Sequence, residues 1–149
     1  MPDFLVTTVD KFTFKVPTDR FYTAEGVWAK EEDGRIRIGL SDFVQQRNGD
    51  VTFAEVKAAG TTVAAGEEVA NIETIKVTIT YTSPVNGKIM EVNPAMSDAP
   101  EAINQDPYGT GWLALLEVAD WKAESAKLLD PQAYFSLMKG QAEEETKKL

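Results

Sequence analysis

The sequence contains neither cysteine nor histidine, and these two absences remove most of the side-chain chemistry that operates near neutral pH. Without thiols there is no thiol nucleophile and no disulfide, and without imidazoles there is no histidine base and none of the usual zinc sites. Aspartate and glutamate remain as candidate acids and bases, but no pair of them has a spacing or setting that marks it out. If the protein takes part in a reaction, we expect an attached group to supply the chemistry.

Cationic residues are also scarce, with 15 Lys and Arg against 24 Asp and Glu and a formal charge of −9. A negative field of this kind repels phosphate backbones, so we expect no nucleic-acid partner. Basic docking surfaces on protein partners would complement the charge, although solubility alone explains it equally well.

Long apolar runs are missing too. The first residues, Met1 to Val6, have neither the basic nor the apolar region of a signal peptide. No segment approaches the apolar length of a membrane span. We therefore expect a cytoplasmic protein with no membrane partner.

Short strands dominate the pattern of apolar residues and turns. The 149 residues, 43% of them hydrophobic, suit a single domain over 1–149. Strands are predicted at 12–16, 27–30, 35–40, 51–56, 68–75, 77–82, 87–92 and 112–118. Their even spacing favours a barrel or sandwich. The predicted fold is mainly β with peripheral helices, around a core at about 21–118.

Helices are predicted at three places. Ser41 can cap a short helix through Gln46, and Ser97–Glu101 resembles a helix start. C-terminal helices are expected at about 121–147: one from Trp121 to Leu129, and a second opened by Asp130 and Pro131. The second helix should turn four side chains toward the core: Tyr134, Phe135, Leu137 and Met138. Its end, 143–148, is expected to be solvated and frayed.

Lys76 occupies the most informative segment. It lies ten residues after Gly66 and eleven before Gly87, and these glycines can end two strands that run out to a tight turn and back. A carrier with a swinging arm needs its lysine on such a turn, where a modifying enzyme can reach the amine. Glu73 could hydrogen-bond the turn or meet a positive group on that enzyme. A lysine at a hairpin tip is, however, usually just a solvated residue.

The wider pattern favours the carrier. The segments Glu73-Thr74-Ile75-Lys76-Val77 and Ser83-Pro84-Val85-Asn86-Gly87 resemble the Glu-Ser-Val-Lys-Ala motif and the Ser/Ala-Pro-x-Ser-Gly turn of the glycine cleavage H-protein family. Further matches keep their order and spacing over roughly residues 21 to 118. The resemblance implies a hybrid barrel-sandwich fold of the lipoyl/biotinyl type and a non-catalytic carrier with covalent lipoate on Lys76. It also implies that a lipoate ligase or lipoyl synthase machinery attaches the group and recognises Glu73.

Two departures from the family concern the place where the loaded arm docks. Gly26 and Val27 stand where the family has His-Glu before the tryptophan, and Phe43 stands where it has a histidine. In the family this glutamate and histidine line the dock for the methylamine-loaded arm. A buried cation beside Val27 and Phe43 would lack partners, which disfavours glycine-derived cargo. Ordinary core substitution also explains both positions.

The altered dock, together with Thr74, Ile75 and Val77 around the lysine, resembles lipoate-binding proteins that serve a sulfur-oxidising heterodisulfide-reductase-like system. That resemblance implies a carrier between enzymes of such a complex. The alternative within the family is a carrier of the aminomethyl group between glycine cleavage enzymes. A monomer would suit an arm that visits several enzymes.

Other classes remain as alternatives. A biotin carrier places methionines beside its lysine, and a 2-oxoacid dehydrogenase lipoyl domain carries Asp-Lys-Ala; neither pattern is present. An unmodified interaction module would not need the lysine. An independent enzyme would have to use acids such as Asp98, Glu101 and Asp106, which capping explains, or Trp28 and Trp112, which suit a core.

Overall fold

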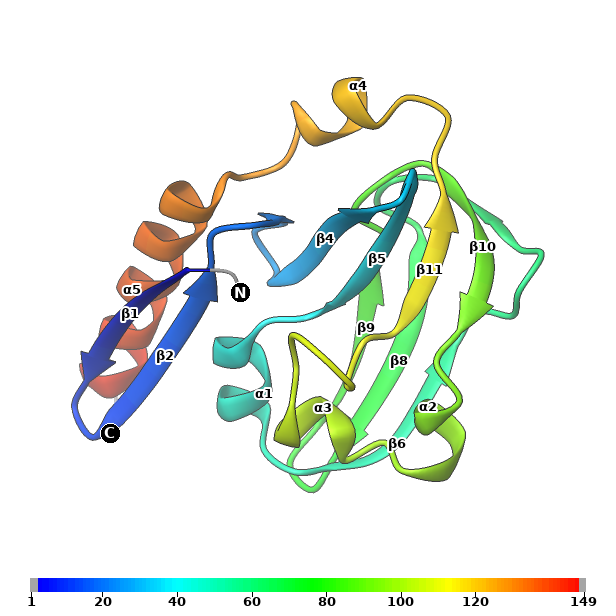
Figure 1. Cartoon of the computed structure of the whole chain (residues 1–149). Helices are drawn as coiled ribbons and strands as arrows, with labels where there is room; N and C mark the ends of the chain where they lie inside the picture. Colours follow the sequence, from blue (N-terminus) through cyan, green and yellow to red (C-terminus); the bar gives the residue numbers. More distant parts are fainter. Residues whose placement is uncertain (1–2, 148–149) are drawn as a thin grey trace.

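The computed structural model describes residues 3–147 and shows two facing β-sheets with helices at their edges (Figure 1). The larger sheet has six strands in the order β3-β4-β5-β11-β10-β7, and the smaller has three in the order β6-β8-β9. The strands of the two sheets are β3 (Phe21–Tyr22), β4 (Val27–Glu32), β5 (Arg35–Leu40), β6 (Val51–Val56), β7 (Thr62–Val63), β8 (Glu68–Thr74), β9 (Thr78–Thr82), β10 (Gly87–Val92) and β11 (Ala114–Glu117).

A separate two-stranded hairpin of β1 (Phe4–Val9) and β2 (Phe12–Pro17) lies beside the sandwich, against the last helix. The helices are α1 (Asp42–Asn48), α2 (Ala95–Asp98), α3 (Ala102–Gln105), α4 (Trp121–Ser125) and α5 (Pro131–Lys147). In Figure 1, α1 stands between this N-terminal hairpin and the sandwich. The predicted mainly β fold with peripheral helices is confirmed.

Local signals account for several elements of the fold. Asp33 and Gly34 adopt φ values of 51° and 82°, the positive values that a tight hairpin turn needs, and they join β4 to β5. Ser41 caps α1 as predicted, because its hydroxyl accepts the N–H of Val44 at 3.3 Å. The core between the sheets includes the buried Ile38 and Leu40, whereas the fully buried Trp28 lies on the other face of the larger sheet, beside Arg20 and Tyr108.

Three predicted helices differ from the structure. The segment predicted as one helix from Trp121 ends at Ser125, because Leu129 instead exchanges two backbone hydrogen bonds with Tyr22 at 2.8 and 2.9 Å. The helix start predicted at 97–101 is replaced by the two short helices α2 and α3. Within α5, Tyr134 and Met138 are buried as predicted, but Leu137 is 36% exposed.

The end of α5 is helical to Lys147; the fraying expected over 143–148 stays a prediction, and Lys148 lies outside the described residues. Glu145 of α5 lies near Arg47 of α1, which ties the helix end to the site. Among the residues that the structure describes, no helix is both long and apolar enough to cross a membrane.

Candidate functional site

The turn that carries Lys76 lies between β8 and β9 of the smaller sheet. Glu73 and Thr78 form the pair of this ladder nearest the turn. Beyond them Ile75 is 68% exposed and Val77 is 41% exposed, and Lys76 is exposed as well. A modifying enzyme can therefore approach the lysine amine from solvent.

The side chain of Thr74 holds this turn. Its hydroxyl accepts the backbone N–H groups of Lys76 at 3.2 Å and Val77 at 3.1 Å. It also donates to the Val77 carbonyl at 3.2 Å. A hydroxyl has one donor and two acceptor positions, so all of its hydrogen-bonding capacity is used here. Within residues 3–147 the Glu73 carboxylate makes no hydrogen bond or ion pair, so the turn-holding role expected of Glu73 belongs to Thr74.

A second support comes from the loop after α1. The Ile75 N–H donates to the Asp50 carbonyl at 3.1 Å. Asn104 of α3 holds that loop on both sides of Asp50, because its amide donates to the Gly49 carbonyl at 3.1 Å and accepts the Val51 N–H at 2.8 Å. No local pattern in the sequence assigns Asn104 this positioning role.

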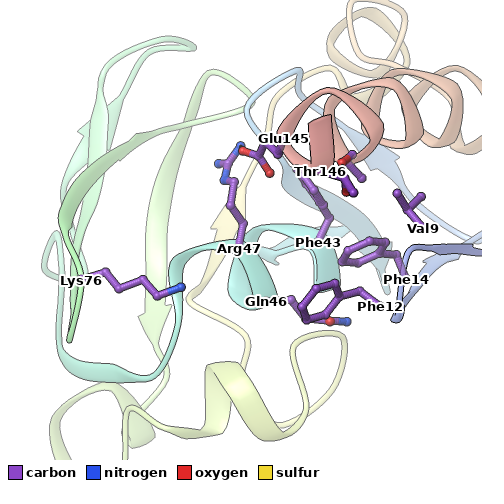
Figure 2. A pocket seen from close by; sticks show the side chains of 10 residues that line it. Val9, Phe12, Phe14, Phe43, Gln46, Arg47, Lys76, Glu145 and Thr146 are labelled. Carbon is purple, nitrogen blue, oxygen red and sulfur yellow. Dashed lines mark hydrogen bonds and ion pairs between the residues drawn. The ribbon is translucent and has the colours of Figure 1, made fainter. Parts of the chain in front are cut away.

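A cavity of about 260 Å³ opens beside the lysine. It is lined by Val9, Phe12, Phe14, Phe43, Gln46, Arg47, Lys76, Ala142, Glu145 and Thr146. Figure 2 shows the Lys76 side chain extending from its hairpin toward this cavity, with the nitrogen leading. The side chain passes over Gly49, where an added Cβ would meet the Lys76 Cε at 3.5 Å. That distance is ordinary van der Waals contact, so the positive φ of 88°, and not space for the lysine, accounts for glycine at this position.

Of the two positions expected to line a docking groove, Phe43 lines this cavity and Val27 does not. Phe43 is 2% exposed and packs edge-on against Phe14, with ring centroids 5.3 Å apart. Val27 is fully buried in β4, where it pairs with Leu40. This corrects the expectation that both residues belong to one groove, since the Val27 side chain faces the core instead.

Besides Lys76, the charged residues that line the cavity are Arg47 and Glu145, which form an ion pair. The Nη1 of Arg47 lies 3.9 Å from the Oε1 of Glu145, and the Arg47 guanidinium lies 5.1 Å from the centre of the Phe43 ring. Glu145 supplies the carboxylate among the lining residues, and it already faces Arg47. A cation entering the cavity would therefore meet the positive Arg47 beside the carboxylate of Glu145.

The acids and tryptophans that an enzyme might use have structural settings. Asp106 accepts a backbone N–H four residues later in its turn. Asp98 ends α2 and Glu101 precedes α3, neither with a side-chain capping bond. The fully buried Trp28 donates to two backbone carbonyls, both at 3.1 Å, and Trp112 is half-buried beside the core. Within the described chain, no cluster of three or more acids is placed to hold a metal ion.

Two buried tyrosines lie near α1. Burial raises the pKa of Tyr81 and of Tyr134 to about 12. Tyr81 accepts a hydrogen bond from the Asn48 amide at 2.9 Å, and the Tyr134 hydroxyl lies 2.7 Å from that of Ser41. Both phenols stay protonated near neutral pH, where they act as hydrogen-bonding groups of the core.

Comparisons with known proteins agree on one family. The sequence profile of the family described as Glycine cleavage H-protein matches residues 20–141. A glycine cleavage system H protein from Listeria monocytogenes is 40% identical over 119 residues, which cover 80% of this chain and 94% of that protein. One from Thermus thermophilus is 39% identical over 127 residues, covering 85% and 98%. The crystal structure of a glycine cleavage system H protein from Mycobacterium marinum superposes with a TM-score of 0.74 at 33% identity, covering 81% of this chain and 97% of that one.

Proposed function

Because this chain belongs to the glycine cleavage H-protein family, we propose that it is a non-catalytic carrier with a lipoyl group joined covalently to Lys76. Such a group supplies a disulfide ring that can open to accept a transferred group and later release it. The observation that carries the assignment is the setting of Lys76: an exposed turn, fixed by Thr74, with the side chain directed to a neighbouring cavity.

The test is the intact mass of the protein after incubation with lipoate, ATP and a lipoate ligase. We expect a mass increase of one lipoyl group in the wild type and in Lys88→Arg, a control in which another exposed lysine of the chain is changed. Lys76→Arg should show no increase. An unchanged wild-type mass, or lipoylation of Lys76→Arg, would contradict the assignment.

Glu73 is proposed as a contact for the lipoylating enzyme. Its carboxylate is exposed and is not engaged by another described side chain, so it is free to meet a basic group. Glu73→Gln should slow lipoylation, and the difference should shrink as salt is added, because exposed charges are screened. Glu55→Gln, an exposed acid of the neighbouring strand β6, serves as the control. Equal lipoylation rates for the two variants would contradict the proposed contact.

For the partners, the comparisons favour glycine cleavage enzymes, since the relatives described above are named glycine cleavage system H proteins. We accordingly propose that the arm serves these enzymes. The lipoylated protein should accept an aminomethyl group from glycine in the presence of glycine decarboxylase, and aminomethyltransferase should remove it. Failure to load, with lipoylation intact, would refute this pathway without touching the carrier assignment.

Sulfur oxidation by a heterodisulfide-reductase-like complex is the second candidate. No relative described above carries a name that supports it. One observation favours it: Phe43, in place of the family's histidine, gives the cavity an apolar wall next to the lysine. The single carrier domain, the monomeric state and the cytoplasmic location stay predictions.

A further inference from the structure

Most residues around the cavity beside Lys76 lie outside the segment that matches the family. Six of its ten lining residues lie outside the matched residues 20–141: Val9, Phe12 and Phe14 of the N-terminal hairpin, and Ala142, Glu145 and Thr146 at the end of α5. The four others are Phe43, Gln46 and Arg47 of α1, and Lys76 itself. The N-terminal hairpin and the helix end therefore add a wall opposite the lysine (Figure 2).

The N-terminal hairpin is fixed in place by hydrogen bonds to the sandwich. The Lys15 N–H donates to the Asp42 carboxylate at 3.0 Å, and the Lys15 carbonyl accepts the Tyr108 hydroxyl at 2.6 Å. Two residues before Lys15, the Thr13 carbonyl accepts a hydrogen bond from the Gln46 side-chain amide at 2.9 Å. Two of these bonds join β2 to α1 and the third joins it to Tyr108, so the hairpin is held in place as one side of the cavity.

One face of the N-terminal hairpin lines the cavity and the other does not. Val9 pairs with Phe12 and Thr7 pairs with Phe14, so Val9, Phe12 and Phe14 share the face that lines the cavity. Phe4 lies on the other face. Phe12 at 44% and Phe4 at 43% are almost equally exposed, although only one of them borders the cavity.

The chemistry of the cavity suits an uncharged occupant. Five of its ten lining side chains are apolar: Val9, Phe12, Phe14, Phe43 and Ala142. Arg47 would repel a cation, and the carboxylate of Glu145 lies 3.9 Å from Arg47. Moving an unpaired charge into such surroundings is costly, whereas burying an apolar group is favourable. The volume of about 260 Å³ is slightly below the range of about 300–1,000 Å³ that holds drug-sized ligands, which suits the end of one arm.

We propose that the N-terminal hairpin and the end of α5 form a shelter for the uncharged arm on Lys76, and that a cationic cargo keeps the arm out of it. This inference rests on the proposed lipoylation of Lys76. Phe12 is its key residue because it lines the cavity with an apolar ring while remaining partly exposed, so that its removal opens the cavity to solvent. A sheltered dithiolane is protected from solvent thiols, since thiol–disulfide exchange depends on access.

The first test measures how fast dithiothreitol reduces the oxidised arm. The chain has no cysteine, so iodoacetamide added at intervals labels the sulfurs of the reduced arm, and mass spectrometry counts them. We expect reduction of lipoylated Phe12→Ala to be about fivefold faster than that of the wild type, the factor that corresponds to about 1 kcal/mol. Lipoylated Phe4→Ala, the matched control on the outer face, should react at the wild-type rate. Equal rates for all three proteins would overturn the shelter.

The second test needs no variant. The reduced arm of the wild-type protein is capped with neutral methyl groups or with cationic aminoethyl groups, and thermal unfolding is recorded. A group that binds the folded state raises its melting temperature. We expect the methyl-capped carrier to melt about 2–4 °C above the aminoethyl-capped one. Equal melting temperatures, or a higher one for the cationic cap, would overturn the charge preference.

Failure of the two proposals can be told apart. If lipoylation does not occur, or occurs away from Lys76, the intact-mass experiment already rejects the carrier assignment. If Lys76 is lipoylated and the arm reacts and melts as though fully exposed, the shelter alone is rejected.

Discussion

The hydroxyl of Thr74 should determine how efficiently Lys76 is lipoylated. It makes three hydrogen bonds within the turn, two from backbone N–H groups and one to a carbonyl. Each such bond contributes about 0.5–1.5 kcal/mol net, with exposed ones at the low end. Together they should favour the ordered turn by about 1.5 kcal/mol, or about tenfold. Thr74→Val removes the hydroxyl but keeps the shape and the β-branched character of the side chain.

We expect kcat/KM for lipoyl transfer to Thr74→Val by a lipoate ligase to fall severalfold and by no more than about tenfold, because the enzyme binds the fraction of molecules with an ordered turn. Thr74→Ser keeps the hydroxyl and should be lipoylated at close to the wild-type rate. Both variants should unfold at nearly the wild-type denaturant midpoint, since the change lies at a solvent-exposed tip. Wild-type transfer to Thr74→Val, or equally slow transfer to both variants, would refute the reasoning.

Two further predictions concern residues that support α1 and the loop after it. Asn104→Ala should lower the free energy of unfolding by about 1–3 kcal/mol, because it leaves the Val51 N–H and the Gly49 carbonyl without their partner. Urea unfolding measures this change. Asn104→Asp keeps the acceptor for the Val51 N–H and should lose less stability. Folding raises the pKa of Tyr134 to about 12, above the unfolded value of about 10, so its contribution to stability is complete below about pH 10 and is lost as the pH rises toward 12. At pH 8, Tyr134→Phe should be less stable than the wild type by about 1 kcal/mol, because it loses the hydrogen bond to Ser41. Between pH 10 and 11, however, the variant should lose less stability than the wild type does. Parallel plots of unfolding free energy against pH for the two proteins would contradict this.

Much of the sandwich could be predicted because its signals are local. Asp33 and Gly34 specify a turn by their own backbone preferences, and the Ser41 cap depends on a residue three positions away. Lys76 could be placed at a hairpin tip for the same reason. These features need only short-range physics and a regular alternation of side chains.

The N-terminal hairpin was only half predicted because its pattern is mixed. Strand β1 carries Phe4 and Val6 on one face and Leu5 and Val9 on the other, so it lacks the clean alternation that marks a half-buried strand. The apolar face with Val9 is explained by tertiary contacts with α5 and with the cavity. No local pattern could show that residues near 12, 45 and 145 meet around one lysine.

Phe43 acquires a physical explanation from this assembly. Taken alone, an aromatic residue at a position where the family has histidine could be an ordinary core substitution or an altered dock. The ring is 2% exposed and packs on Phe14 of the hairpin, yet it also borders the cavity. Without β2 over it, Phe43 would lose the contact with Phe14, and burial of a phenylalanine is worth about 1.5–3 kcal/mol. Phe43 of α1 and the N-terminal hairpin therefore depend on each other for packing, and the sequence at position 43 could not by itself reveal this contact.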